Sequence, residues 1–160
     1  MKKHLTLFFS LFAIGLTSCQ KGGDVTSQQA AIDDAKIQAY IKANNIPAIK
    51  DPSGLYYQIV TPGDPKTKPT LLSTVQLTYT NNFLDGVNFD HVNVVSYKLG
   101  KLINSGGYMI RGLQIGLPYI GTGGRIILIV PSALAYGNVT QYTVPANSIL
   151  IYTIDLIGVS

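Results

Sequence analysis

The sequence predicts an α+β domain: a small antiparallel sheet covered by one short helix and preceded by an N-terminal helix. Apolar and polar residues alternate over residues 75–80 and 148–157, which is typical of strands. Residues 126–130 are consecutive apolar residues, mostly β-branched, which indicates a strand buried on both faces. Residues 108–117 place their apolar positions on one helical stripe, which two glycines and Pro118 keep short. A helix on an antiparallel sheet is an α+β arrangement.

The N-terminal helix is predicted by apolar residues that recur at roughly helical spacing from residue 30 onward. These residues are Ile32, Ala35, Ile37, Tyr40 and Ile41. Asn44, Asn45 and Pro47 end the pattern, so residues 30–52 are assigned to this helix and a linker. We expect the apolar face to pack on the domain; the alternative is that it meets a partner or a second copy of the chain.

The remaining strands follow between turn residues. Residues 53–60 form a first strand, which a loop rich in proline and glycine ends. Asp85-Gly86 is a turn pair that folds the chain back and brings residues 89–90 close to Tyr79. Another strand covers residues 94–99 and stops at a glycine.

One phenol is placed where the central strand ends. Pro131 cannot donate to a strand ladder and therefore ends the strand. Residues 132–135 form a short turn that Gly137 closes, and this turn delivers Tyr136 to the lip of the sheet. A rigid strand that presents an aromatic group at a loop favours a pocket.

Residues 1–18 have the pattern of a targeting segment, with a basic start and an apolar stretch too short to span a bilayer. Leu16-Thr17-Ser18-Cys19 resembles a bacterial lipobox, in which the cysteine is lipidated and becomes the new N-terminus. Cys19 is the single cysteine of the chain, so it has no disulfide partner. We therefore predict a lipoprotein signal peptide over residues 1–18 and a lipidated flexible tether over residues 19–29. An ordinary secretory signal is the alternative.

Composition excludes several classes of function. Charged residues make up 12% of the 160 residues, and two of the four excess positive charges belong to Lys2 and Lys3 in the leader. The remaining chain has no cluster of basic residues, so it lacks the electrostatic pattern of nucleic-acid binding. His91 is the single histidine after the leader, which argues against a metal site and against a Ser-His-acid triad. The inventory suits binding, or a reaction that breaks no bond.

A series of residues then points to one family. In chain order they are Tyr79, Asp85-Gly86, Phe89-Asp90, Met109-Ile110-Arg111-Gly112-Leu113, Leu134-Ala135-Tyr136-Gly137, Val144-Pro145 and Tyr152. This series resembles the FK506-binding-protein (FKBP) family of peptidyl-prolyl cis-trans isomerases over about residues 55–159. With the lipobox and the N-terminal helix, the chain resembles the lipid-anchored FKBPs of Bacteroidetes.

The resemblance implies a twisted antiparallel sheet wrapped around one short helix, over residues 53–160, with a proline pocket between them. It implies three catalytic residues, Asp90, Ile110 and Tyr136, with the Ile110 backbone N–H meeting a substrate carbonyl. It implies that the substrate is contacted by Tyr79, Phe89, Val95, Met109, Leu113, Val144 and Tyr152. It implies isomerase activity without a metal or cofactor. The expected partners are prolyl segments of envelope proteins and FK506-like macrolides, and the lipid anchor holds the domain at a membrane of the bacterial envelope.

Two departures from the family keep an alternative function open. The pocket floor is commonly tryptophan in this family, whereas this chain has Leu113. The loops differ as well: the segment between Asp90 and Leu99 is shorter and loses an arginine, the loop before Met109 carries the extra Ser105-Gly106-Gly107, and the loop over residues 138–143 has no histidine. The first hypothesis is an isomerase that assists folding of envelope proteins. The alternative is a module that binds proline peptides or another partner with little turnover, and a purely structural lipoprotein is the third interpretation.

Overall fold

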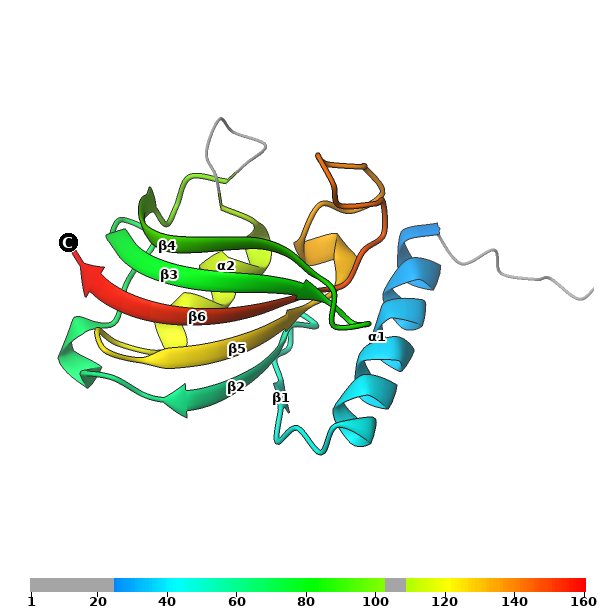
Figure 1. Cartoon of the computed structure of the whole chain (residues 1–160), viewed down its shortest axis with the longest axis horizontal. Coiled ribbons are helices and arrows are strands. Elements are labelled where there is room, and N and C mark those ends of the chain that lie inside the picture. The colour runs from blue at the N-terminus through cyan, green and yellow to red at the C-terminus, as the bar shows by residue number, and fades with distance from the viewer. Residues whose placement is uncertain (1–24, 103–108) are drawn as a thin grey trace, which may run out of the picture.

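The computed structural model describes residues 25–102 and 109–160 (Figure 1). Their helices and strands are α1 (Val25–Ala43), β1 (Ile49–Lys50), β2 (Tyr56–Thr61), β3 (Thr74–Phe83), β4 (Asn88–Lys98), α2 (Arg111–Gly116), β5 (Arg125–Val130) and β6 (Leu150–Val159). The strands form one antiparallel sheet in the order β1-β2-β5-β6-β3-β4. The predicted α+β class is therefore confirmed. The predicted leader, the lipidated Cys19 and the first part of the tether lie outside the described residues.

Helix α2 packs against one face of the sheet, which Figure 1 shows behind the strands. The alternate residues Ile126, Leu128 and Val130 of β5 point to this face and are fully buried. A Cβ atom on Gly112 would lie 2.5 Å from Val130 Cγ1, and one on Gly116 would lie 2.5 Å from Leu128 Cδ2. The two glycines of α2 therefore allow the helix to lie against the strand at close range.

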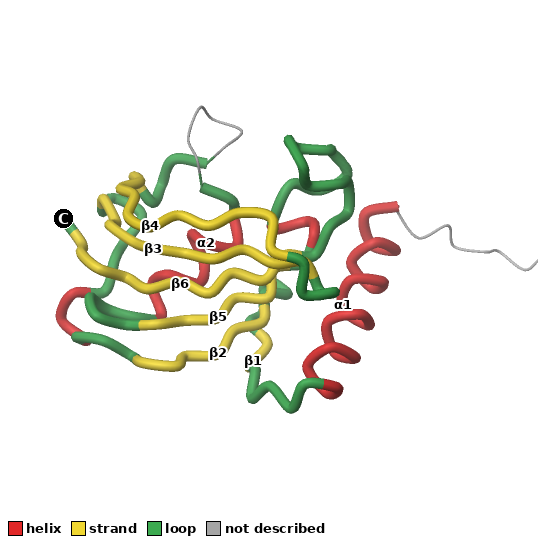
Figure 2. Tube along the Cα trace, in the orientation of Figure 1, coloured by secondary structure: helices red, strands yellow, loops and turns green. Residues whose placement is uncertain are grey.

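Helix α1 packs on the other face, at the end of the sheet where β5 finishes and β6 begins (Figures 1 and 2). Ile37 is fully buried there together with Ile129 of β5 and Ile151 of β6. The prediction that the N-terminal helix packs on the domain is confirmed. Strand β5 is accordingly covered on both faces, as its unbroken apolar run predicted.

Two details of the predicted helix are wrong. The helix begins at Val25, so residues 25–29 are helical and do not belong to a flexible tether. This segment ends in two glutamines and is followed by two alanines, residues with good helix propensity, and Gln29 donates a hydrogen bond to Asp33 one turn on. The predicted apolar stripe is confirmed only for Ile37, Tyr40 and Ile41, because Ile32 is 47% exposed whereas Asp33 is fully buried.

The linker after α1 is held by side chains. The Tyr119 hydroxyl donates a short hydrogen bond to the carboxylate of Asp51, and the ring of Tyr119 stacks on that of Tyr57 with centroids 4.3 Å apart. The hydrogen bond raises the pKa of Tyr119 to about 12, whereas the bonds that Asp51 accepts, first from Ser53 and then from Tyr119, lower the pKa of Asp51. The linker is thus fixed to the segment that follows α2.

The β3–β4 hairpin is longer than predicted. Its turn lies at Asp85-Gly86, as expected, and Gly86 has a φ of 86° that favours glycine. Strand β4 runs without a break from Asn88 to Lys98, whereas the sequence suggested a strand over residues 94–99 only. Register shifts occur after Leu77 and after Asn81, and bulges of this kind obscure a strict alternation.

Within the described parts of the chain, neither helix has the length and hydropathy needed to cross a bilayer.

Candidate active site

Tyrosines from two neighbouring strands form one wall of the candidate site. Tyr79 lies on β3 and Tyr152 on β6, and their ring centroids are 5.8 Å apart at a tilt of 56°. Tyr152 is only 4% exposed, whereas Tyr79 is half-buried. Burial raises the pKa of both phenols well above the usual value, so both hydroxyls stay protonated across the physiological range.

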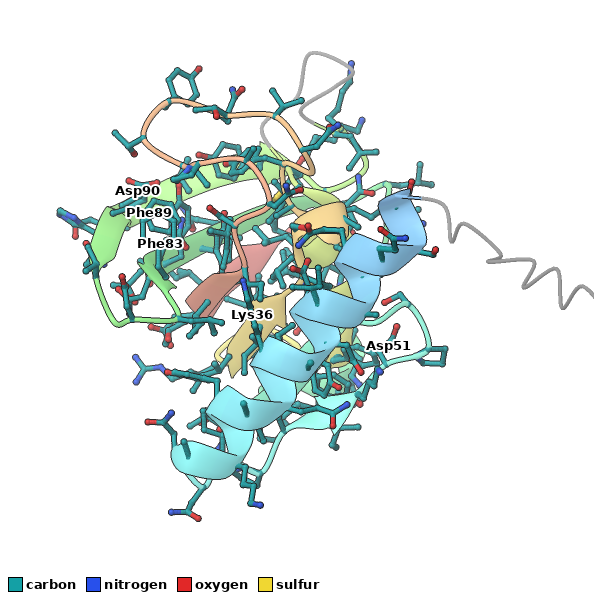
Figure 3. The ribbon with its side chains drawn as sticks, turned by 90° about the vertical axis from the view of Figure 1, so that its right-hand side faces the viewer. Lys36, Asp51, Phe83, Phe89 and Asp90 are labelled. Carbon is teal, nitrogen blue, oxygen red and sulfur yellow. The ribbon has the colours of Figure 1, made fainter. Side chains whose placement is uncertain are left out.

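The β3–β4 hairpin supplies a second wall. The rings of Phe83 and Phe89 stack with centroids 4.4 Å apart and an interplanar angle of 28°. Figure 3 shows these two residues together with Asp90 on the same side of the molecule. Phe89 was among the predicted site residues, whereas Phe83 was not. Their pairing could have been predicted, because the two aromatic residues flank a tight Asp-Gly turn and the hairpin therefore brings them together.

Asp90 brings the carboxylate of the site. It lies opposite Asn81 in the hairpin, and the Tyr79 hydroxyl donates to Asp90 Oδ2 at 3.2 Å. The negative charge of Asp90 contributes to the raised pKa of Tyr79, Tyr136 and Tyr152, although burial is the largest cause for each. The three phenols therefore lie around one carboxylate.

Tyr136 and Tyr97 complete this cluster. Tyr136 shares a hydrogen bond with Tyr152, and Tyr97 of β4 shares one with Tyr79. Burial raises the pKa of Tyr136, so its hydroxyl also remains a donor. Tyr97 was not among the predicted site residues. The strand that carries it was predicted only over residues 94–99, so its pairing with β3 was not evident from the sequence.

A short turn fixes the backbone on both sides of Tyr136. The turn is the 3₁₀ segment Ser132–Leu134, and its Ser132 carbonyl accepts from Ala135 N at 3.0 Å and from Gly137 N at 2.8 Å. Gly137 has a φ of 63°, a left-handed conformation that glycine adopts without strain. Strand β5 leads directly into this turn, so the position of Tyr136 follows from a buried strand, as the sequence predicted.

The start of α2 forms the floor. Met109, Ile110 and Leu113 are each at most 4% exposed and belong to the core under the aromatic walls. Ile110 is the residue before the first helical turn, with an extended backbone, and its carbonyl accepts from Leu113 N and Gln114 N. Its own N–H donates to no other residue within the described ranges. Gln114 anchors the helix by donating to the Leu99 carbonyl at 2.8 Å.

The structure places all ten predicted site residues of the domain in or beside the main hydrophobic core, which also includes residues outside the candidate site, such as Leu55 and Leu117. Nine of them belong to one apolar cluster: Tyr79, Phe89, Val95, Met109, Ile110, Leu113, Tyr136, Val144 and Tyr152. The tenth, Asp90, joins the cluster through its hydrogen bond with Tyr79. Their individual roles remain predictions. Among the described residues, no three His, Cys, Asp or Glu side chains are grouped so that they could hold a metal ion.

Comparison with known proteins decides the family. The model of the FKBP-type peptidyl-prolyl cis-trans isomerases matches residues 65–157, which include all ten predicted site residues of the domain. The chain belongs to this family. Helix α1 lies outside the matched region.

Among curated relatives, the FKBP-type isomerase FkpA of Buchnera aphidicola subsp. Schizaphis graminum is 39% identical over 111 residues, which cover 69% of this chain and 42% of that protein. FkpA of Escherichia coli K12 is 34% identical over 108 residues, covering 67% of this chain and 38% of that protein. The chain therefore spans less than half the length of these relatives. FK506-binding protein 4 of Aspergillus fumigatus is 33% identical over 90 residues, which cover 54% of this chain and 17% of that protein.

Solved structures share the fold of this FKBP chain. The crystal structure of E. coli FkpA superposes with a TM-score of 0.68 at 30% identity, covering 84% of this chain and 62% of that chain. A peptidyl-prolyl cis-trans isomerase from Pseudomonas syringae superposes with a TM-score of 0.69 at 23% identity, covering 87% of this chain and 99% of that chain. The twisted antiparallel sheet with a short helix against it is the FKBP fold that the sequence predicted.

Proposed function

We propose that this chain catalyses cis–trans isomerisation of X-Pro peptide bonds in the cluster formed by Tyr79, Phe89, Asp90, Tyr136 and Tyr152. The observation that carries this proposal is the arrangement of protonated phenols around one carboxylate above an apolar floor. Such a site offers apolar contact and fixed hydrogen-bond donors. The described part of the site presents no activated nucleophile, which fits a reaction that makes and breaks no covalent bond.

The physical requirement is rotation about an amide. Resonance gives this rotation a barrier of about 18–20 kcal/mol. At the twisted geometry the resonance is lost, so the carbonyl is less polar than in the planar amide. An apolar floor made of Met109 and Leu113 destabilises the planar form relative to the twisted one, and fixed donors orient it. The Ile110 N–H is placed at the edge of this floor and is proposed to bind a substrate carbonyl.

Asp90 and the Tyr136 hydroxyl are proposed to shape the electrostatic field on the substrate without carrying protons. Burial raises the pKa of Tyr136, so this phenol holds its proton and acts as a donor. Isomerisation requires no net proton transfer, so a fixed dipole next to a fixed charge is sufficient. The remaining predicted contacts, Val95 and Val144, are proposed to shape the rim.

The proposed setting is the bacterial envelope. The sequence features that support it are the apolar leader over residues 1–18 and the lipobox that ends at Cys19. The proposed substrates are prolyl segments of envelope proteins, and lipidation at Cys19 is proposed to hold the domain at a membrane. FK506-like macrolides are proposed as ligands because a relative carries the name FK506-binding protein. Leu113 offers them a smaller floor than tryptophan would.

The test is an isomerisation assay with protein that begins at Gln20, which retains every described residue. A set of short peptides with different residues before proline reports kcat/KM. We expect catalysis by the wild type and a loss of roughly 3- to 10-fold in Tyr136→Phe and in Asp90→Ala, the size of one lost hydrogen bond. Tyr57→Phe is the matched control, because Tyr57 lies on β2 and stacks on Tyr119 away from the pocket.

A folded wild type that binds prolyl peptides at an unaltered isomerisation rate would replace this proposal with the alternative, a binding module with little turnover. Equal losses in Tyr136→Phe and Tyr57→Phe would remove the assigned role of Tyr136. A loss of activity that follows the titration of an essential carboxylate, with binding unchanged, would contradict the field mechanism.

A further inference from the structure

A carboxylate of the N-terminal helix is buried directly behind the turn that carries Tyr136. Asp33 lies on α1 and is fully buried. Its Oδ2 accepts from the Ser132 N–H at 2.8 Å and from the Ser132 hydroxyl at 2.6 Å, and its Oδ1 accepts from Gln29 Nε2 at 2.8 Å. Helix α1 and the turn Ser132–Leu134 are in contact, although 99 residues separate Asp33 from Ser132.

Packing alone does not require a carboxylate at this position. Moving an ionised group out of water costs free energy unless hydrogen bonds replace its hydration, and well-packed apolar residues often serve stability equally well. Ile37, one turn along the same helix, is such an apolar residue. Asp33 differs from it because its oxygens fix the direction of the Ser132 N–H and hydroxyl.

Hydrogen bonds of Ser132 connect Asp33 to the backbone on both sides of Tyr136. The N–H and hydroxyl of Ser132 are held by Asp33, while its carbonyl accepts from Ala135 and Gly137, the two neighbours of Tyr136. Two consecutive hydrogen-bonded steps therefore lead from α1 to the backbone on both sides of the phenol. Because the turn is short, a rotation of Ser132 moves the Tyr136 side chain with it.

The contact is localised. A cavity of about 310 Å³ lies between α1 and the turn on one side, lined by Ala30 and Ala31 of the helix and by Ala133 and Leu134 of the turn. A second cavity of about 370 Å³ lies on the other side and is lined in part by Thr26, Gln29 and Gly137. Two hydrogen bonds from Ser132 to Asp33 hold the turn to the helix beside these cavities.

We propose that Asp33 is a positioning residue of the isomerase, which holds Tyr136 in the pocket through the Ser132 turn. This inference rests on the proposed function, because it assigns a role in that reaction to a helix outside the region shared with the family. Asp33 acts through Ser132 and does not touch the substrate. Docking of the N-terminal helix and orientation of the pocket are therefore one coupled event.

The decisive variant is Asp33→Leu, which fills the same space without holding Ser132. We expect kcat to fall roughly 3- to 10-fold with little change in KM, because an oriented Tyr136 is needed more in the twisted state than in the bound planar state. Asp33→Asn keeps one acceptor oxygen and should restore part of kcat. Urea unfolding of each variant checks that the assay reports folded protein.

Asp34→Leu is the matched control on the same helix. Asp34 accepts from the Tyr56 hydroxyl at 2.7 Å and pairs with Lys50 at 2.6 Å, so its polar contacts fasten α1 to the sheet and not to Ser132. We expect this variant to lose stability and to keep the kcat of the wild type. Equal loss of kcat in the Asp33 and Asp34 variants would mean that both act through helix docking alone, and would overturn the proposal.

A double-mutant cycle with Tyr136→Phe tests the route. If Asp33 acts through the Tyr136 hydroxyl, Asp33→Leu should change kcat less than twofold in the Tyr136→Phe background. Full multiplication of the two effects would overturn the proposed route.

Amide hydrogen exchange provides a readout that does not depend on turnover. We expect faster exchange of the Ser132, Ala135 and Gly137 N–H groups in Asp33→Leu and unchanged exchange in Asp34→Leu. Unchanged exchange in Asp33→Leu would overturn the coupling itself. A wild type without isomerase activity would instead refute the proposed function and, with it, the catalytic role of Asp33, while the exchange data would still decide whether Asp33 holds the turn.

Discussion

The two helices of this molecule reach the same pocket by different means. Helix α2 lies inside the family-matched region and contributes a residue of its own, because Leu113 belongs to the proposed floor and Ile110 directly precedes the helix. Helix α1 lies outside that region and contributes no residue to the floor or walls, yet its Asp33 holds the turn that carries Tyr136. Figure 3 shows α1 crossing the end of the sheet, with Phe83, Phe89 and Asp90 beyond it.

The contacts of the two helices explain this difference. Helix α2 is joined to β5 by apolar contacts at close range, with glycines facing Val130 and Leu128. Helix α1 buries Ile37, packs Tyr40 and Ile41 against the same cluster, and adds directed polar contacts, since Asp33 and Asp34 hold the turn and β2, respectively. Apolar burial provides free energy without direction, whereas hydrogen bonds provide direction at a smaller net free energy. Helix α2 is therefore expected to support the fold, and α1 to support the orientation of one turn.

The largest expected effect on stability comes from truncating one buried side chain of each helix. Leu113→Ala and Ile37→Ala should each lower the free energy of unfolding by about 2–5 kcal/mol, because each leaves a cavity. Urea unfolding measures this loss. The kcat/KM of the folded protein should fall strongly in Leu113→Ala, which removes the floor, and much less in Ile37→Ala. Equal losses of kcat/KM would show that the two helices do not differ in the way proposed.

The sequence allowed the places of several candidate site residues in the fold to be predicted, because these places follow from local patterns. Tyr136 follows a proline that ends an apolar strand, and Phe89 follows an Asp-Gly turn. Both positions are determined within a few residues, and the order of such residues along the chain resembles one family. The fold class, the central strand and the grouping of the site residues could therefore be predicted.

The sequence could not reveal the contact behind the turn. Asp33 looks like a solvated residue between apolar positions, and its partner Ser132 is 99 residues away. Helical periodicity assigns polar residues to the exposed face, so it predicts that Asp33 is exposed and Ile32 buried. The structure shows the reverse. A buried polar pair between distant segments leaves no local pattern, and only the assembled fold brings it together.

An intermediate effect on stability is expected when the pH is lowered, because acid weakens the contact of Asp34 on α1 with Lys50. Hydrogen bonds from Lys50 and Tyr56 lower the pKa of Asp34 below its usual value of 3.8. A carboxyl group whose pKa is lower in the folded state stabilises the fold above the unfolded pKa and loses that contribution as pH falls through the folded pKa. Asp34→Asn should therefore lower the urea midpoint at pH 6 and have a smaller effect near pH 2.5. An equal loss at both pH values would show that Asp34 stabilises the helix by packing and not by charge.

The smallest effect is expected on the part of the sheet that α1 leaves uncovered. Arg125 on β5 donates to Asp155 on β6 through Nε at 2.6 Å and through Nη2 at 2.7 Å, and these bonds lower the pKa of Asp155. The two side chains are 51% and 40% exposed, so water and salt screen the pair and its contribution is about 0–1 kcal/mol. Asp155→Asn should shift the urea midpoint slightly and leave kcat/KM unchanged. A marked loss of kcat/KM would show that contacts on this face other than Asp33–Ser132 also affect the pocket. It would then be wrong to assign the orientation of Tyr136 to the Asp33–Ser132 contact alone.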